Sequence, residues 1–231
     1  MFTRLLGVVG GVAFTVRYGL GLWFWQVANR LEKPRYRVVE KLGSGVELRA
    51  YDEYTVAECT FRKPTSMQTA TAAGFRKCAG YIFGRNRKHG AHLWGRSSAL
   101  ASEKMAMTSP VRMAIEQSDK GDTEPIKRVK VSFLMASNYS MSQLPVPDDA
   151  DVKLKRVPAH FMAAVKFNGA PPTSKKIREK KQLVLDQMTK AAVGRAVSGE
   201  ALVYGYHDPF ITPNLLRKNE VGVFVDMPKC A

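Results

Sequence analysis

The chain has 231 residues, with 36 Lys and Arg against 20 Asp and Glu, for a formal net charge of +16. Its composition, 45% hydrophobic and 24% charged, is that of a globular protein, which excludes whole-chain disorder, collagen and coiled coil. The length suits one domain, or at most two small ones. The surplus of positive charge suits a nucleic acid, an anionic membrane surface, an acidic partner or a basic organelle leader, and identifies no fold.

The first 33 residues form an apolar segment that differs from the rest of the chain. No acidic residue precedes Glu32, and Arg17 is the one charged residue within the apolar stretch 5–28. A helix over that stretch would measure about 36 Å, enough to cross a bilayer, although Arg17 is unfavourable near its middle. Residues 1–33 are therefore interpreted either as a membrane anchor or as an organelle-targeting leader. A third alternative is that the aromatic residues 23–25 pack onto the folded domain.

After Pro34 the apolar residues alternate, which predicts strands. Gly43–Gly45 and Asp52–Glu53 supply the first two turns. A helix then begins near Pro64–Ser66 and presents one apolar face as far as Ile82. The strands predicted in this half cover residues 36–41, 46–51, 55–61, 104–115 and 129–135.

The same pattern begins again after a connector at residues 145–151. Pro171–Ser174 opens a second helix, which has Ile177, Val184 and Met188 on one face. The strands predicted in this half cover residues 152–157, 160–167, 201–206 and 219–225. Strands, a helix and two strands thus occur twice, which predicts a duplicated α+β unit. Two twisted antiparallel sheets closed into a barrel-like body, with both helices packed outside, would bury these apolar faces.

The sequence lacks the motifs of common catalytic and metal sites. It contains no GxSxG, no phosphate-binding loop, no GxGxxG after a strand and no paired-carboxylate signature, so no enzymatic activity is expected. Four His and three Cys without CxxC or HExxH spacing predict neither a zinc site nor a disulfide framework.

Positive charge gathers between Arg62 and Arg96, where eight Lys and Arg occur without an acid. Such a run would support loose phosphate binding by counterion release. The lysines of the second helix have the pattern of a solvated face, and no nucleic-acid-binding signature accompanies either group. No specific nucleic-acid partner is expected.

A methionine pair in residues 104–110 suggests a ligand site. On a strand, Met105 and Met107 share one face, while Lys104 and Ala106 share the other. Thioethers pack readily against large flat rings, so this pair beside basic residues suits a planar tetrapyrrole with anionic propionates. The alternative is that the two methionines simply fill the core.

From about Trp25 to Val225 the chain resembles the SOUL heme-binding protein family. Four blocks in the right order carry the resemblance: residues 74–86 (GFRKCAGYIFGRN), 104–111 (KMAMTSPV), 131–147 (beginning VSFL and ending LPVP) and 204–221 (beginning YGYHDPF and ending RKNEV). The resemblance implies a distorted antiparallel β-barrel flanked by two helices and built from two similar halves. This SOUL domain would cover residues 34–228, and an apolar helix would precede it.

The resemblance also implies a function and a site. The chain would bind heme or another porphyrin as a carrier or buffer, holding it mainly by apolar contacts. Carried over from the family, Met105 and Met107 would contact the ring, and Lys104, Arg85 and Asn86 would form the polar edge. No histidine occupies a family position that assigns it as axial ligand, so heme is expected without an identified axial ligand.

Two features depart from the family pattern. Residues 89–102 look like an insertion beside the expected pocket, which could cap it, occlude it, bring His89 or His92 to the iron, or serve as a docking loop. The segment 1–33 lies outside the shared domain and keeps a second hypothesis open: a non-heme accessory or scaffold subunit of an organelle membrane complex. We expect a membrane-associated protein of a chloroplast or mitochondrion, with a cytoplasmic location as the alternative.

Overall fold

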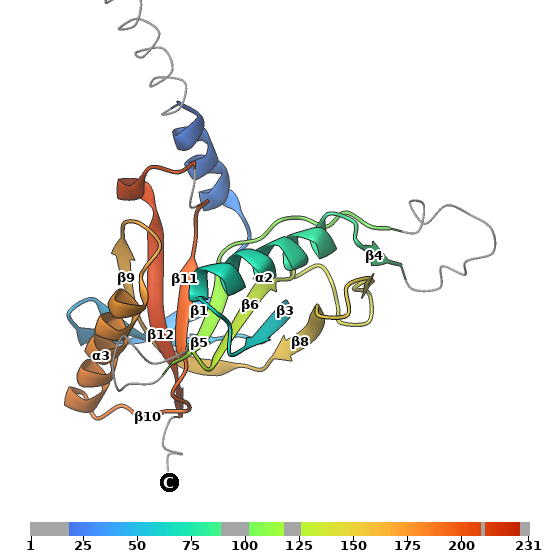
Figure 1. Cartoon of the computed structure of the whole chain (residues 1–231). Coiled ribbons are helices and arrows are strands. Elements are labelled where there is room, and N and C mark those ends of the chain that lie inside the picture. The colour runs from blue at the N-terminus through green and yellow to red at the C-terminus, as the bar shows by residue number, and fades with distance from the viewer. Residues whose placement is uncertain (1–18, 89–101, 118–125, 209–210, 227–231) are drawn as a thin grey trace, which may run out of the picture.

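The strands expected from the alternation of apolar residues are present, and they form one curled antiparallel sheet (Figure 1). The computed structural model describes residues 19–88, 102–117, 126–208 and 211–226. The sheet contains β1 (Tyr36–Gly43), β2 (Val46–Tyr51), β3 (Tyr54–Arg62), β5 (Val111–Glu116), β6 (Arg128–Leu134), β8 (Lys153–Val157), β9 (His160–Asn168), β10 (Arg195–Ala196), β11 (Ala201–Gly205) and β12 (Lys218–Asp226). A separate short pair joins β4 (Asn86–Arg87) to β7 (Val146–Pro147). The expected α+β class is confirmed.

The strand order is symmetrical about its centre. It runs β1-β2-β9-β12-β11-β5-β6-β3-β8, so that outward from the β11–β5 pair one meets β12 and β6, then β9 and β3, then β2 and β8. β3 and β9 also share the same pattern of buried and exposed positions. This is the arrangement expected of a duplicated unit in which β2 of the first half pairs with β9 of the second, and β8 of the second half pairs with β3 of the first.

The sheet is a half-barrel, where the sequence predicted two sheets closed into a barrel. β1 and β8 lie at its opposite ends and, among the described strands, do not pair with each other. Six consecutive residues of β1 are exposed, so neither face of this edge strand is covered over that stretch. Register shifts at Val38/Glu40 and Lys41/Gly43 interrupt the pairing of β1 with β2, a common way to protect a free edge.

Two helices cover one face of this sheet. α2 (Met67–Ile82) begins after Ser66, whose hydroxyl accepts from the Thr69 N–H at 3.1 Å, and α3 (Ser174–Lys190) begins after Thr173, which caps Lys176 N–H at 3.3 Å. α2 packs on β6 and β3, and α3 on β12 and β9. Both predicted helix starts are confirmed.

The two faces of the sheet differ sharply in chemistry. Cross-strand partners on the helix-covered face form an apolar row: Cys59, Val131, Met113, Val203, Val221 and Val165. The next residues along each strand point to the other face, where the partners are Glu58, Ser132, Arg112, Tyr204, Glu220 and Lys166. All of these but Lys166 are buried, because the sheet curls around its own inner face.

A third helix covers residues 19–30 and stands at one end of the sheet, beside the 3₁₀ helix η2 (Asn214–Leu216) (Figure 1). Trp25 stacks on His207, with ring centroids 6.5 Å apart. Packing of an aromatic residue onto the domain, one of the three alternatives for this segment, is thus present for Trp25. Residues 1–18 lie outside the described residues. Within the described part of the chain, no helix is long and apolar enough to cross a membrane.

The expected strand 104–115 is wrong in its first half. Only Val111–Glu116 pairs in the sheet, and residues 104–107 are extended without a ladder of their own. This segment lies against the end of α2 instead, where Met105 N–H donates to Ile82 O at 2.9 Å. Pro110 has no N–H to donate, which separates the segment from the strand that follows.

Candidate functional site

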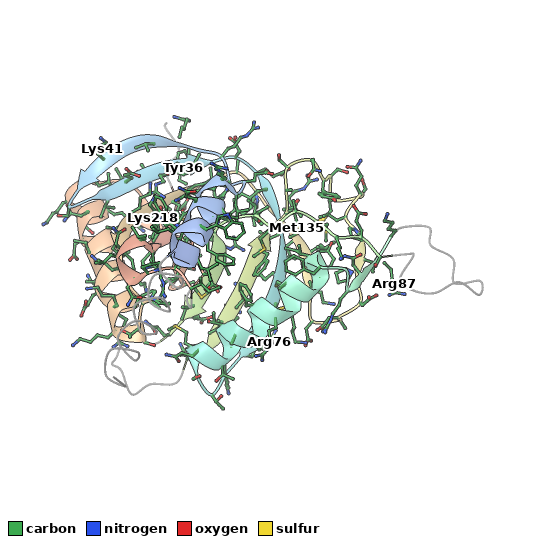
Figure 2. The ribbon with its side chains drawn as sticks, turned by 90° about the horizontal axis from the view of Figure 1, so that it is seen from above. Tyr36, Lys41, Arg76, Arg87, Met135 and Lys218 are labelled. Atoms are coloured by element: carbon green, nitrogen blue, oxygen red, sulfur yellow. The ribbon has the colours of Figure 1, made fainter. Side chains whose placement is uncertain are left out.

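A groove of about 550 Å³ opens between the segment before β1 and the loop after β6. This volume lies within the range of small-molecule sites. The lining comes from four places: residues 32–35, residues 52–55 at the β2–β3 turn, Leu134–Ala136 with Ser137 and residues 139–141, and Arg156 of β8. Figure 2 shows Met135 on one side of the N-terminal helix and Lys218 on the other.

The floor of the groove is apolar. Leu134, Met135 and Ala136 are buried, and Met141 and Tyr139 rise beside them, half-buried. The Tyr139 hydroxyl donates to Glu103 Oε1 at 2.7 Å. This hydrogen bond, together with partial burial and the carboxylate charge, raises the pKa of Tyr139, so the phenol stays neutral at physiological pH.

Backbone and side-chain bonds of Glu32 fix the width of the groove. The Glu32 carbonyl accepts from Ser109 N–H at 2.8 Å, and its carboxylate Oε1 accepts from Ser137 N–H at 2.8 Å. On the opposite side, Met135 N–H donates to Thr55 O at 2.8 Å. The groove is therefore bounded by segments that are bonded to one another and is preformed.

The rim carries charges of both signs. Lys33, Arg35 and Arg156 are the cations, and Glu32, Asp52 and Glu53 are the anions. Arg156 lies 3.4 Å from Glu53, and both side chains are more than half exposed. An exposed pair of this kind is weak and opens readily toward a ligand.

The inner end of the groove meets a small void of about 10 Å³ against the inner face of the sheet. Pro34, Tyr54 and Leu134 line both spaces, and Arg112 and Tyr204 line only the void. The Arg112 Nε–H is buried and has no hydrogen-bond partner among the described residues, while its Nη2 bonds Glu58 Oε2 at 3.2 Å. A void of this size accommodates a single water molecule, which would satisfy a donor of this kind.

None of the five site residues predicted from the sequence lines the groove. Arg85 and Lys104 are exposed, and the Arg85 stem lies along Gly80 of α2. Asn86 is buried at 2% exposure, and its amide is fully used. Its Nδ2 donates to Tyr81 O at 2.6 Å and Glu103 O at 2.8 Å, and its Oδ1 accepts from Glu103 N–H at 2.9 Å. The structure thus gives Asn86 a positioning role for the methionine segment.

The predicted methionines lie behind the groove. Met105 is 7% exposed and Met107 is half-buried, while Lys104 and Ala106 point outward, so the predicted alternation is present. Met105 and Met107 share one apolar cluster with Met135, Tyr139 and Met141 of the groove. The methionine pair therefore supports the groove from the core side, and its contact with a ligand stays a prediction.

Sequence reasoning missed the residues that do line the groove. Met135, Tyr139 and Met141 fall inside the block of residues 131–147 that carries the family resemblance, so a signal was present there. Lys33 and Arg35 follow the apolar segment and belong to no motif that marks them as site residues. Residues 89–101, the greater part of the predicted insertion, lie outside the described residues.

The groove offers thioether and phenol groups, and the described residues that line it include no histidine or cysteine. Methionine and tyrosine are both known axial ligands of heme iron. No group of three or more His, Cys, Asp or Glu side chains in the described part of the chain is placed to hold a metal ion. The lining supplies an apolar floor, soft thioethers and a charged rim.

The fold is an α+β domain with a half-barrel sheet and a groove beside the segment before β1, and comparison with known proteins gives its family. The profile of the SOUL heme-binding proteins matches residues 31–224, so the chain belongs to the SOUL heme-binding protein family. No curated protein sequence matches the chain.

Several solved structures share the fold. The C-terminal domain of EcmrR has a TM-score of 0.51 at 14% identity, covering 84% of this chain and 99% of that domain. An uncharacterized conserved protein from Listeria innocua has a TM-score of 0.52 at 13% identity, covering 78% of this chain and 92% of that one. A hydrolase from Listeria innocua has a TM-score of 0.51 at 11% identity, covering 78% and 91%. At these identities the likeness shows the fold alone.

Proposed function

We propose that this protein binds a tetrapyrrole, heme or a related porphyrin, in the groove between residues 32–35 and the loop after β6, and acts as a carrier or buffer without chemistry of its own. Membership of the SOUL family supports tetrapyrrole binding. The observation that carries the site is the groove itself, with its methionine-bearing floor and its cations at the rim.

Each part of the ligand has a counterpart in the groove. A porphyrin ring is flat and apolar, and it would lie against Met135, Met141 and Tyr139, where dispersion contacts add up over a large area. Its propionates are anionic, and Arg35 and Arg156 stand at the open edge. Opening of the exposed Arg156–Glu53 pair would free one cation for a carboxylate.

A hemin titration of the full chain, followed by Soret absorbance, tests this proposal. We expect a saturable shift, with binding weakened about tenfold by Met141→Ser through the loss of apolar contact, and also weakened by Arg35→Glu. Val197→Ser is the matched control, because Val197 is a 62% exposed apolar residue outside the groove lining. It should bind hemin like the wild type.

Two other outcomes would either place the ligand elsewhere or overturn tetrapyrrole binding. If Met105→Ala with Met107→Ala weakens binding while Met141→Ser and Arg35→Glu do not, the ring lies on the 104–107 segment, as predicted from the family. If hemin associates no better than with an unrelated basic protein, tetrapyrrole binding is overturned. The accessory or scaffold subunit of an organelle membrane complex then becomes the function to test.

A further inference from the structure

The helix at residues 19–30 has two different sides. Gly21, Trp25 and Ala28, spaced by one to two helical turns, face the domain: a Cβ on Gly21 would lie 2.9 Å from Ile211 O, and Trp25 stacks on His207. Leu20, Trp23 and Val27 share the other side. Their exposed fractions are 51%, 57% and 38%. The outer side is thus an apolar stripe in contact with solvent.

A second apolar element lies at the same end of the molecule. Leu215 of η2 is 86% exposed, the highest value among the large hydrophobic residues described, and Ile211 is 38% exposed. Figure 1 shows η2 and the N-terminal helix at the same end of the molecule, away from β10. The close approach of Gly21 to Ile211 and Pro213 joins the two elements. We call Leu20, Trp23, Val27, Ile211 and Leu215 the apolar tip.

Three cations lie next to the apolar tip. Arg217 and Lys218 follow η2 directly, Lys218 Nζ lies 5.9 Å from the centre of the Trp25 ring, and Lys33 lies close to both Lys218 and His207. Burial lowers the pKa of His207 to about 4, assisted by the charges of Lys218, Lys33 and Arg217. Asp208 partly offsets Arg217. We call Lys33, Arg217 and Lys218 the basic collar.

We propose that the apolar tip and the basic collar form a docking surface for an anionic lipid bilayer, with the tip entering the interfacial region. Exposed Trp and Leu beside Lys and Arg is the chemistry of an interfacial anchor, since the apolar groups enter the headgroup boundary while the cations meet the lipid phosphates. Residues 1–18, which precede the tip in the chain, contain no acid and are mostly apolar. Of the tip and collar residues only Lys33 also lies at the rim of the groove, and docking through the tip does not depend on tetrapyrrole binding.

Sedimentation with vesicles tests the surface in the full chain. The probes are vesicles of phosphatidylcholine alone and of phosphatidylcholine with 30% phosphatidylglycerol, and the readout is the bound fraction against lipid concentration. We expect binding to the anionic vesicles that weakens as salt rises, and a loss of about tenfold for Leu215→Ser or Trp23→Ser. Val197→Ser is the control, since Val197 follows β10 at the opposite end of the molecule (Figure 1).

The charge of the basic collar is tested by Arg217→Glu. Binding to the anionic vesicles should weaken about fivefold for each unit of charge changed, which should remove the preference for anionic over neutral vesicles. Circular dichroism of each variant establishes that it is folded. The proposal is overturned if wild-type protein does not bind the vesicles, if Leu215→Ser and Trp23→Ser bind like Val197→Ser, or if binding is the same for neutral and anionic vesicles.

Discussion

Arg49 on β2 and Glu220 on β12 form a buried ion pair on the inner face of the sheet, with Nη1 and Oε2 2.8 Å apart and side-chain exposures of 0% and 1%. The two strands are not neighbours, because β9 lies between them. Arg49 also bonds Glu47 at 2.9 Å and Tyr51 at 3.3 Å, and its guanidinium lies over the Tyr36 ring. The pair therefore links two strands across the strand that separates them.

Arg49→Met should destabilise the protein by about 3 kcal/mol or more, because Lys166, at 3.7 Å, is then the one cation among the described residues that pairs with the buried Glu220 carboxylate. The double variant Arg49→Met with Glu220→Leu should recover part of this loss, since no uncompensated charge remains. Urea denaturation measures both. Lys176→Met, which breaks an exposed pair with Glu179 on α3, is the control and should change stability by about 0.5 kcal/mol or less.

Gly74 fixes the distance between α2 and β6. A Cβ at this position would lie 2.6 Å from Val131 Cβ and 3.1 Å from the Phe61 ring. Gly74→Ala should therefore destabilise the protein by about 1–3 kcal/mol through overpacking, despite the better helix propensity of alanine. Gly199→Ala is the control, since no atom of the described residues lies within 4 Å of its Cβ position. Equal denaturation midpoints for the two variants would show that the helix shifts freely.

The amide of Asn86 holds the methionine segment against the end of α2. Asn86→Ala should cost about 1–3 kcal/mol, because it leaves buried backbone groups of Tyr81 and Glu103 without partners. Asn86→Asp keeps the acceptor for Glu103 N–H but replaces two donors by an anion facing carbonyls, so it should not restore stability. Thermal denaturation measures both changes, and Arg87→Ala, an exposed neighbour, is the control. Wild-type stability of Asn86→Asp would contradict the role of the Asn86 amide in holding the methionine segment.

Much of the fold could be predicted because it follows from local periodicity. Period-two alternation marked β2, β3 and β9, and Ser66 and Thr173 marked the helix starts, since capping is a short-range interaction. The half-barrel could not be predicted, because closure depends on whether β1 and β8 meet, a contact between residues far apart in the chain. The strand at 104–107 was also mispredicted, because the same alternation arises when an extended segment packs on a helix end.

In the candidate site, too, the features set by local periodicity could be predicted and those set by contacts between distant residues could not. The methionine alternation at 105 and 107 was readable, since burial on an extended chain repeats every two residues. The groove could not be predicted, because its sides come from four places that are far apart in the sequence: residues 32–35, the β2–β3 turn, the loop after β6, and strand β8. The polar row on the inner face was hidden for a similar reason. The partners of Arg112 and Glu220 on this face lie on other strands, and the register that places them opposite each other is not written in the local sequence.

His207 links the docking of the N-terminal helix to pH. Its Nδ1 accepts from Lys218 N–H at 3.1 Å, so this nitrogen carries no proton, and its ring stacks on Trp25. Burial, then the charges of Lys218, Lys33 and Arg217, lower its pKa to about 4. The unfolded chain has a histidine pKa near 6.5 and therefore binds more protons than the folded protein between about pH 6.5 and 4.

The consequence is a loss of stability on acidification within that window. Stability that is fully present above about pH 6.5 should decline as the pH falls toward 4, and His207→Gln, which keeps an acceptor without titrating, should flatten this part of the profile. Denaturation midpoints measured between pH 7 and pH 4 test the slope, and the imidazole resonance in an NMR titration reports the pKa directly. His160→Gln is the comparison, because His160 stacks on Tyr51 within the sheet rather than under the N-terminal helix. Trp25 fluorescence should change with His207 protonation in the wild type and lose that step in His207→Gln, since the ring that titrates is the one it stacks on.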